Sequence, residues 1–135
     1  MNKIFSLGKL ALYLFKSKFS MSQDCLFCKL VSGQILAKEI YRDENILAFH
    51  DINPQAPVHF LVIPTKHIDS LNHVLPSDSE CLGKIQEIIP QLARKLNIFE
   101  NGYRVVQNNG ANGGQTVFHI HYHVLGGRGL KWPPG

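Results

Sequence analysis

The chain has 135 residues, 44% of them hydrophobic and 18% charged, which fits one soluble globular domain and excludes a disordered chain. Its formal charge of +4 comes from residues 1–20, which contain four lysines and no acidic residue. The rest of the chain is neutral, with ten basic and ten acidic residues. This balance argues against a broad nucleic-acid-binding surface, and no run of about 18 apolar residues predicts a membrane-spanning helix.

Residues 1–20 combine lysines with a short apolar stretch at Leu10–Phe15. They resemble a secretion signal only superficially, because lysines flank the stretch and no small-residue cleavage site follows it. We interpret them as an extension outside the domain, with Met21 as an alternative start, and weak association with a membrane surface as the other interpretation. The three cysteines are too few for a disulfide framework, so we expect a reducing compartment, the cytoplasm.

Hydrophobic periodicity and turn residues predict two helices and five strands between residues 24 and 135. The first elements are a short helix at Cys25–Val31 ended by Gly33 and strands at Glu39–Arg42, Ile46–His50 and Val58–Ile63. A long helix follows, from a capping box at Ser77 to about Leu96. Within it we expect Pro90 to cause a kink or the loss of one hydrogen bond, and Cys81 to be a small buried side chain. A strand at Tyr103–Asn108, a glycine-rich loop at residues 109–116 and a strand at Val117–Leu125 follow. The order predicts an α+β fold: an antiparallel sheet with one long helix and a short N-terminal helix.

Three histidines alternate with apolar residues near the C-terminus, at His119, His121 and His123. In a strand they would share one face, because side chains alternate between faces. Over four residues of strand the outer two lie roughly 13–14 Å apart, so a single metal ion cannot bind all three. The preceding glycine-rich loop predicts an anion site beside them, since its backbone amides can converge on a phosphate. Gln115 and Thr116 offer further side-chain donors there.

The histidine motif at residues 119–125 resembles the histidine triad (HIT) superfamily, specifically its nucleotide-binding Hint branch. Further segments extend the resemblance over residues 24–135: 48–52, 54–64, 113–116, 126–128 and 132–135. Such proteins hydrolyse the P–N bond of purine nucleoside 5′-phosphoramidates, such as adenosine phosphoramidates or AMP-lysine, through a nucleotidyl-histidine intermediate, with no catalytic metal required. The resemblance implies the HIT-like fold and a homodimer with a continuous sheet. The apolar residues on both sides of the long helix agree with an extra buried face.

The resemblance also assigns roles to individual residues. His121 matches the nucleophile, and His119, His123 and His59 complete the catalytic set. His123 stands where the related uridylyltransferases have glutamine, which favours a hydrolase. Six positions match substrate contacts: Asp51 and Ile52 for ribose and base, and Asn108, Gly114, Gln115 and Thr116 beside the phosphate. Their structural alternatives are a turn former for Asp51 and a strand-end cap for Asn108, while His50 and His73 receive no role.

Cys25 and Cys28 have the spacing of half a zinc site, although such a pair can also be redox-active or simply buried. Several histidine triad relatives complete the site with two histidines, which implies structural Zn²⁺ on Cys25, Cys28, His67 and His119. Many close Hint relatives lack the cysteines. The alternative to an enzyme is a nucleotide-sensing or scaffold module with incidental turnover. The expected partners are a purine nucleotide and a second copy of the chain, with no nucleic acid.

Overall fold

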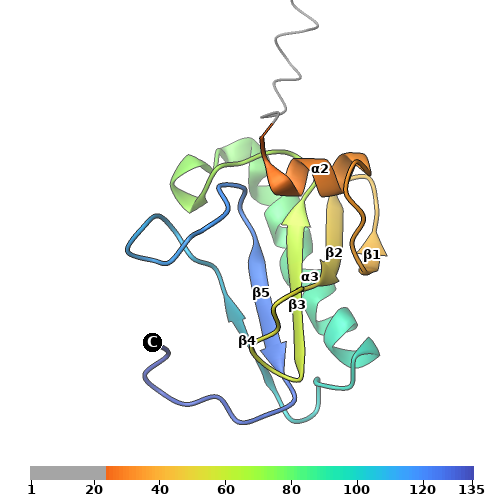
Figure 1. Cartoon of the computed structure of the whole chain (residues 1–135), viewed down its shortest axis with the longest axis vertical. Helices are drawn as coiled ribbons and strands as arrows, with labels where there is room; N and C mark the ends of the chain where they lie inside the picture. The colour runs from red at the N-terminus through yellow and green to blue at the C-terminus, as the bar shows by residue number, and fades with distance from the viewer. Residues whose placement is uncertain (1–23) are drawn as a thin grey trace, which may run out of the picture.

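The computed structural model describes residues 24–135, so the predicted extension at residues 1–20, its membrane association and the alternative start at Met21 lie outside the described residues. Five strands form one antiparallel sheet in the order β1-β2-β3-β5-β4 (Figure 1). Their bounds are β1 Glu39–Arg42, β2 Ile46–His50, β3 Val58–Pro64, β4 Tyr103–Val106 and β5 Tyr122–Gly126. The predicted α+β fold is confirmed.

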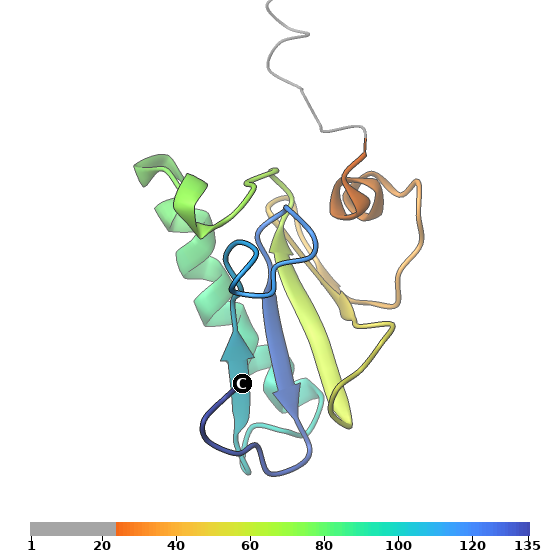
Figure 2. The ribbon, with the colours of Figure 1, turned by 60° about the vertical axis from the view of Figure 1, so that its left-hand side comes forward.

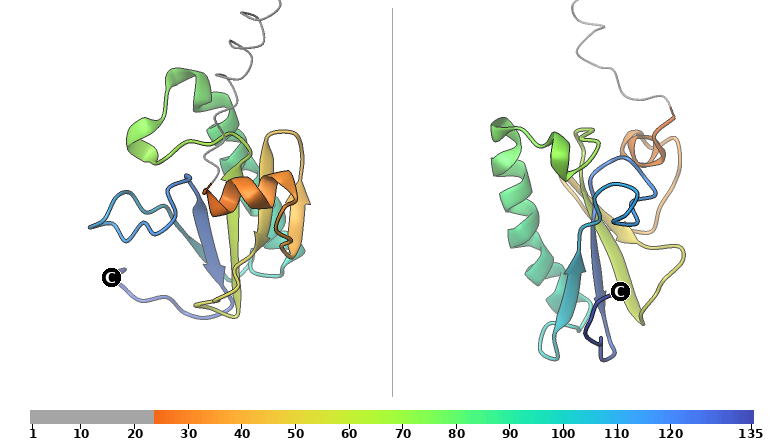
Figure 3. Two further views of the ribbon diagram at one scale, coloured as in Figure 1. Left: turned by 45° about the horizontal axis from the view of Figure 1, so that its top comes forward. Right: turned by 90° about the vertical axis from the view of Figure 1, so that its left-hand side faces the viewer.

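Helices cover opposite faces of this sheet (Figures 2 and 3). The long helix α3 (Ser79–Lys95) packs along one face, and the short helix α2 (Leu26–Ser32) lies over one end of the other. Strand residues alternate between two apolar clusters, because successive side chains point to opposite faces. On the α3 face the cluster contains Ile46, Ala48, Phe60, Val62, Tyr122 and Val124; on the α2 face it contains Leu47, Phe49, Leu61 and Ile63 together with Phe27 and Leu30 of the helix.

Helix α2 is too short to be stable alone and is held at both ends. At its start, the Cys25 Sγ accepts a hydrogen bond from the Cys28 amide at 3.3 Å. Gly33 ends the helix with φ of 80°, a left-handed conformation that glycine adopts without strain. The Arg42 guanidinium on β1 donates to the carbonyls of Leu30 and Val31 in the last turn of the helix. The helix is therefore fixed to the sheet by more than its apolar side.

The long helix begins two residues later than predicted. Pro76–Asp78 form a 3₁₀ turn, η2, and the buried Asp78 accepts hydrogen bonds from the Leu75 amide and the Lys66 ammonium. Asp78, rather than the predicted Ser77, therefore organises this end of the helix. The helix continues through Pro90 to Lys95. A further 3₁₀ turn, η1, spans Leu71–His73.

The last strand is also shorter than predicted, which matters for the histidines. β5 begins at Tyr122, and residues 117–119 form a bend. Upstream of the strand, the Ile120 amide donates to the Ile68 carbonyl at 2.7 Å instead of joining the ladder. His119 and His121 thus lie outside β5, and the predicted continuous strand over Val117–Leu125 is wrong for its first half.

β4 likewise ends at Val106, two residues before the predicted end. Cys81 is half-buried beside the α3 cluster, with its thiol 3.6 Å from the Asn45 carbonyl. None of the helices within residues 24–135 combines the length and apolar character needed to cross a bilayer.

Candidate metal centre and histidine site

Four side chains converge between the start of α2 and the bend before β5: Cys25, Cys28, His67 and His119. We call these four residues the metal cluster. Their ligand atoms all lie within 4.8 Å of one another. The Cys28 Sγ is 3.3 Å from the His67 Nδ1 and 3.6 Å from the His119 Nδ1, and the Cys25 Sγ is 3.5 Å from the His119 Nδ1.

These separations fit a tetrahedral zinc ion. Zn–S bonds of about 2.3 Å and Zn–N bonds of about 2.05 Å place sulfur and nitrogen about 3.5 Å apart. Both imidazoles turn Nδ1 toward the cluster and donate from Nε2 outside it: His119 to the Pro64 carbonyl at 2.8 Å, and His67 to the Asp69 carboxylate. That arrangement leaves the Nδ1 lone pairs free for a metal.

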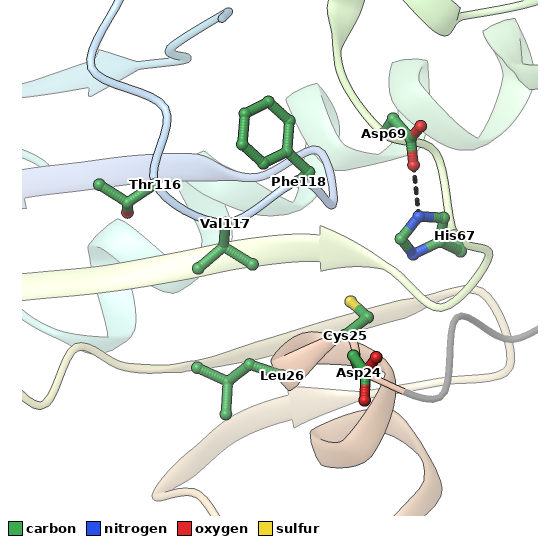
Figure 4. A pocket seen from close by; sticks show the side chains of 8 residues that line it. All are labelled: Asp24, Cys25, Leu26, His67, Asp69, Thr116, Val117 and Phe118. Atoms are coloured by element: carbon green, nitrogen blue, oxygen red, sulfur yellow. Dashed lines mark hydrogen bonds and ion pairs between the residues drawn. The ribbon is translucent and has the colours of Figure 1, made fainter. Parts of the chain in front are cut away.

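A cavity of about 560 Å³ opens beside the metal cluster (Figure 4). Its lining includes Cys25, His67, Asp69, Thr116 and the exposed Phe118. In Figure 4 the Cys25 Sγ points toward the His67 ring, and Asp69 lies on the far side of that ring. When bound, zinc would crosslink α2 to the segment before β5, with all four coordination positions filled by protein.

The ring of His121 lies next to this cluster and is buried, with 4% of its surface exposed. Its Nδ1 is 2.8 Å from the His119 carbonyl, an acceptor only, so Nδ1 carries the proton. The other nitrogen, Nε2, therefore holds a lone pair. Burial lowers the pKa of His121, partly opposed by this hydrogen bond and by the charge of Asp51. The imidazole is thus neutral at pH 7 and has the tautomer of a nucleophile at Nε2.

A second pair of imidazoles faces His121 from the sheet. His59 and His123 are diagonal neighbours on β3 and β5, with Nε2 of His59 2.9 Å from Nδ1 of His123. The Gln55 backbone amide, which can only donate, bonds the His59 Nδ1 at 3.0 Å. His59 consequently donates from Nε2, and His123 accepts at Nδ1 and presents an Nε2–H. This series of hydrogen bonds, from the Gln55 amide through His59 to His123, thus determines which nitrogen of each ring carries a proton.

Asp51 places a carboxylate beside these two imidazoles. Its Oδ2 lies 3.4 Å from the His59 Nε2 and 3.9 Å from the His123 Nδ1. Burial, and to a smaller extent the neighbouring His121 and His59, lower the pKa of His123 to about 4. Burial also lowers the pKa of His59, partly offset by Asp51. Both imidazoles are therefore neutral at pH 7 in the free protein.

Asp51, His59 and His123 are close enough to be considered as metal ligands too. Their hydrogen bonds argue otherwise. The His59 nitrogen that faces the group carries a proton, and its 2.9 Å separation from His123 is that of an N–H···N hydrogen bond. We therefore interpret these three residues as a proton-transfer group and the metal cluster as the metal centre. His119 and His123 belong to different groups, in agreement with the sequence argument against one shared ion.

A cavity of about 720 Å³ adjoins the proton-transfer group, within the usual size of small-ligand sites. Two predicted substrate residues, Asp51 and Ile52, line it together with His59. Ile52 and Leu36 both line the cavity and are 98% and 90% exposed, which leaves apolar surface free for a flat ring system. His50, to which the sequence assigned no role, also lines it. No sequence pattern could identify His50 or Leu36 as cavity residues, because only the fold brings them beside Asp51 and Ile52.

The glycine-rich loop differs from the expectation in one respect. The side-chain amide of Gln115 is buried and donates to the carbonyls of Asp69 and Val117, while its oxygen accepts from the Gly110 amide at 2.9 Å. Gln115 therefore braces the loop and is not a free phosphate donor in this structure. The Gly114 amide likewise bonds the Ala111 carbonyl.

The remaining two predicted phosphate contacts lie at different places. Thr116 is exposed and lines the cavity beside His67 rather than the one beside Asp51. Asn108 lies two residues beyond Val106, the last residue of β4, which pairs with His123. The structure thus gathers the histidines and Asp51 closely and leaves the loop contacts further out.

Comparison with known proteins identifies this arrangement. Residues 32–130 match the sequence model of the HIT domain. The chain belongs to the HIT domain family. The match begins after Cys25 and Cys28, so half of the metal cluster precedes the matched region.

Individual relatives agree with the family. An uncharacterized HIT-like protein of Synechocystis is 46% identical over 115 residues, which cover 85% of this chain and all of that protein. A HIT family hydrolase from Legionella pneumophila has a solved structure with a TM-score of 0.81 and 52% identity, covering 83% of this chain and 100% of the other. A histidine triad nucleotide-binding protein from Candida albicans has a TM-score of 0.71 and 32% identity, covering 82% of this chain and 83% of the other.

Proposed function

We propose that this HIT-family chain is a hydrolase of purine nucleoside 5′-phosphoramidates that acts through a covalent nucleotidyl-His121 intermediate. The observation that carries the proposal is the hydrogen bond from the His121 Nδ1 to the His119 carbonyl, which leaves the Nε2 lone pair available for attack. Membership of the family and the likeness to a HIT family hydrolase and a nucleotide-binding protein support it.

In the first step, the His121 Nε2 attacks the α-phosphorus, a P–N bond forms to the imidazole, and the P–N bond to the leaving amine breaks. The amine needs a proton as it departs. His123 is neutral in the free protein, but an anionic phosphate beside it would raise its pKa. The protonated ring would then donate to the amine from Nε2. Its Nδ1 would no longer accept the His59 Nε2–H, so both N–H groups would turn to the Asp51 Oδ2, which lies 3.4 Å from the His59 Nε2 and 3.9 Å from the His123 Nδ1.

In the second step, water attacks the phosphorus and His123 accepts the water proton. The bond to His121 breaks, the nucleoside monophosphate leaves, and the Nε2 lone pair is restored. We assign the ribose to Asp51, a carboxylate that can accept hydrogen bonds from both hydroxyls, and the base to the apolar surface at Ile52. Asn108 and Thr116 are assigned to the phosphate, and Gly114 and Gln115, whose amides bond other loop groups, to supporting the loop.

We further propose that zinc at the metal cluster is structural and that the protein is a homodimer in a reducing cytoplasm. The S–N separations in the metal cluster support zinc. The free thiols of the three cysteines agree with a reducing compartment. β4 forms an edge of the sheet with a partly exposed Val105, which suits pairing with a second copy.

The experiment that tests the function incubates adenosine 5′-phosphoramidate with the wild-type protein, His121→Ala and His73→Ala. His73 is exposed on η1, which makes it the matched control. We expect turnover by the wild type and the control, a loss of at least about a thousandfold in His121→Ala, and an acid-quenched adenylyl adduct on His121 by mass spectrometry. Equal rates for wild type and His121→Ala would contradict the mechanism. Binding of AMP without any turnover by the wild type would favour the nucleotide-sensing module.

A further inference from the structure

The backbone around the nucleophile is not held by the sheet. β5 begins at Tyr122, so the ladder that fixes His123 does not extend to His121. One backbone hydrogen bond, from Ile120 to the Ile68 carbonyl, anchors the segment between His119 and His121. A nucleophile needs an orientation accurate to a fraction of an ångström. Other contacts must therefore supply it.

The first such contact comes through His119. Both nitrogens of its ring have close partners: Nδ1 lies 3.5 and 3.6 Å from the Cys25 and Cys28 sulfurs, and Nε2 donates to the Pro64 carbonyl. The ring is fully buried. Its carbonyl in turn accepts the Nδ1–H of His121 at 2.8 Å. An imidazole held at both nitrogens leaves its own peptide little freedom, so the acceptor of His121 is fixed wherever the metal cluster is closed.

The second contact comes through Phe27, which lies on α2 between the two cysteines. Its ring meets His121 edge-to-face, with centroids 5.0 Å apart and planes at 85°. It also meets His119 at 5.9 Å and 76°, and its side chain is 3% exposed. Edge-to-face pairs have a preferred geometry and add about 0.5–1.5 kcal/mol beyond area burial. The turn of α2 that carries Cys25 and Cys28 thereby also carries the wall against which the nucleophile rests.

We propose that Phe27 is a positioning residue for His121, and that closure of the metal cluster orients the nucleophile through Phe27 and the His119 carbonyl. The proposal rests on the function assigned above. By this proposal the metal cluster affects the rate of nucleotidyl transfer as well as the stability of the protein. Phe27 acts through the imidazole of His121 and does not itself touch the phosphorus.

The test compares Phe27→Leu with Phe60→Leu in the zinc-loaded full-length protein. Phe60 is also fully buried but packs on the α3 face, so the same substitution removes a ring away from the histidines. Three quantities are measured: zinc per chain, kcat and KM for adenosine 5′-phosphoramidate, and the ¹⁵N NMR signals of the His121 ring, which report which nitrogen carries the proton.

We expect both variants to bind one zinc. Phe27→Leu is expected to lower kcat about tenfold to a hundredfold, with KM changed less than about threefold, and to add an Nε2–H population to the His121 signals. Phe60→Leu is expected to keep the wild-type tautomer, with kcat within about threefold. Wild-type kcat together with an unchanged His121 tautomer in Phe27→Leu would overturn the proposal.

Two further arms keep the outcome decisive. If Phe27→Leu does not fold, Phe27→Met retains a flexible apolar side chain at the same place and is subject to the same criteria. If the wild type shows no nucleotidyl transfer, the proposed function fails, while the tautomer of His121 in the variants still decides whether Phe27 positions the ring. The two failures are therefore distinguishable.

Discussion

Replacing His123 by glutamine is expected to reduce the loss of stability that this protein suffers in mild acid. Burial, with the neighbouring His121 and His59, lowers the pKa of His123 to about 4, and the charge of Asp51 opposes the shift only partly. A histidine in the unfolded chain titrates near 6.5. Between these values the unfolded chain binds more protons, so the free energy of unfolding falls as the pH falls.

The size of the effect follows from the two pKa values. A separation of about 2.5 units corresponds to a ceiling of about 3.4 kcal/mol, reached only well below pH 4. Between pH 7 and pH 5, and because 21% of the His123 side chain is exposed to solvent, we expect roughly 1–2 kcal/mol. Glutamine is the suitable replacement, since its oxygen can still accept the hydrogen bond from the His59 Nε2.

Urea denaturation at pH 7, 6 and 5 measures the effect in the wild type, His123→Gln and the control His73→Gln, whose ring is exposed on η1. Protonation of the metal cluster is common to all three chains and cancels in the differences. Between pH 7 and pH 5, the free energy of unfolding of the wild type and of the control should fall by roughly 1–2 kcal/mol more than that of His123→Gln. This difference is expected to hold within about 0.5 kcal/mol. If His123→Gln loses as much stability as the wild type, the buried neutral His123 is not the cause.

Three further predictions concern the metal cluster, the loop and the cavity. Cys28→Ser should abolish stoichiometric zinc binding and lower the Tm, whereas Cys81→Ser should retain the ion; equal zinc content by elemental analysis would refute the site. Gln115→Ala removes three hydrogen bonds and should lower the free energy of unfolding, measured by chemical denaturation, by about 2–3 kcal/mol. Thr116→Ala, at an exposed position, should lower it by less than about 0.5 kcal/mol, and similar losses in the two variants would contradict the bracing role of Gln115. Asp51→Asn keeps the acceptor for the Asn53 amide, so it should leave the Tm nearly unchanged while AMP binds at least about tenfold more weakly in calorimetry; unchanged affinity would remove Asp51 from the ribose site.

Much of the fold could be predicted because local patterns and the tertiary structure agree. The strands at Glu39–Arg42 and Ile46–His50 have the predicted bounds, and β3 differs from its prediction only by including Pro64. Their alternation between two apolar faces requires cover on both sides, and the two helices provide it. The motif at residues 119–125 likewise indicates the histidine triad superfamily from sequence alone, and the match of residues 32–130 to the HIT domain agrees with it.

Tertiary structure decided what local pattern could not. The period of two across the histidines predicted a strand, but residues 117–119 form a bend, His119 lies against Cys25 and Cys28, and β5 starts only at Tyr122. The side-chain amide of Gln115 looked like a free phosphate donor, but it is engaged by hydrogen bonds, one of them to the Asp69 carbonyl, which is distant in sequence.

The sequence by itself determined which elements form and which histidines are present, because hydrophobic period and residue type are local properties of the chain. Only the tertiary structure decided which nitrogen of each histidine carries a proton. A tautomer depends on the partner of the opposite ring nitrogen, and for His121 and His59 those partners are the backbone groups of His119 and Gln55. These partners lie only two and four residues away along the chain, and they reach hydrogen-bond distance through the backbone conformation of the bend before β5 and of the segment before β3, which residue type alone does not specify.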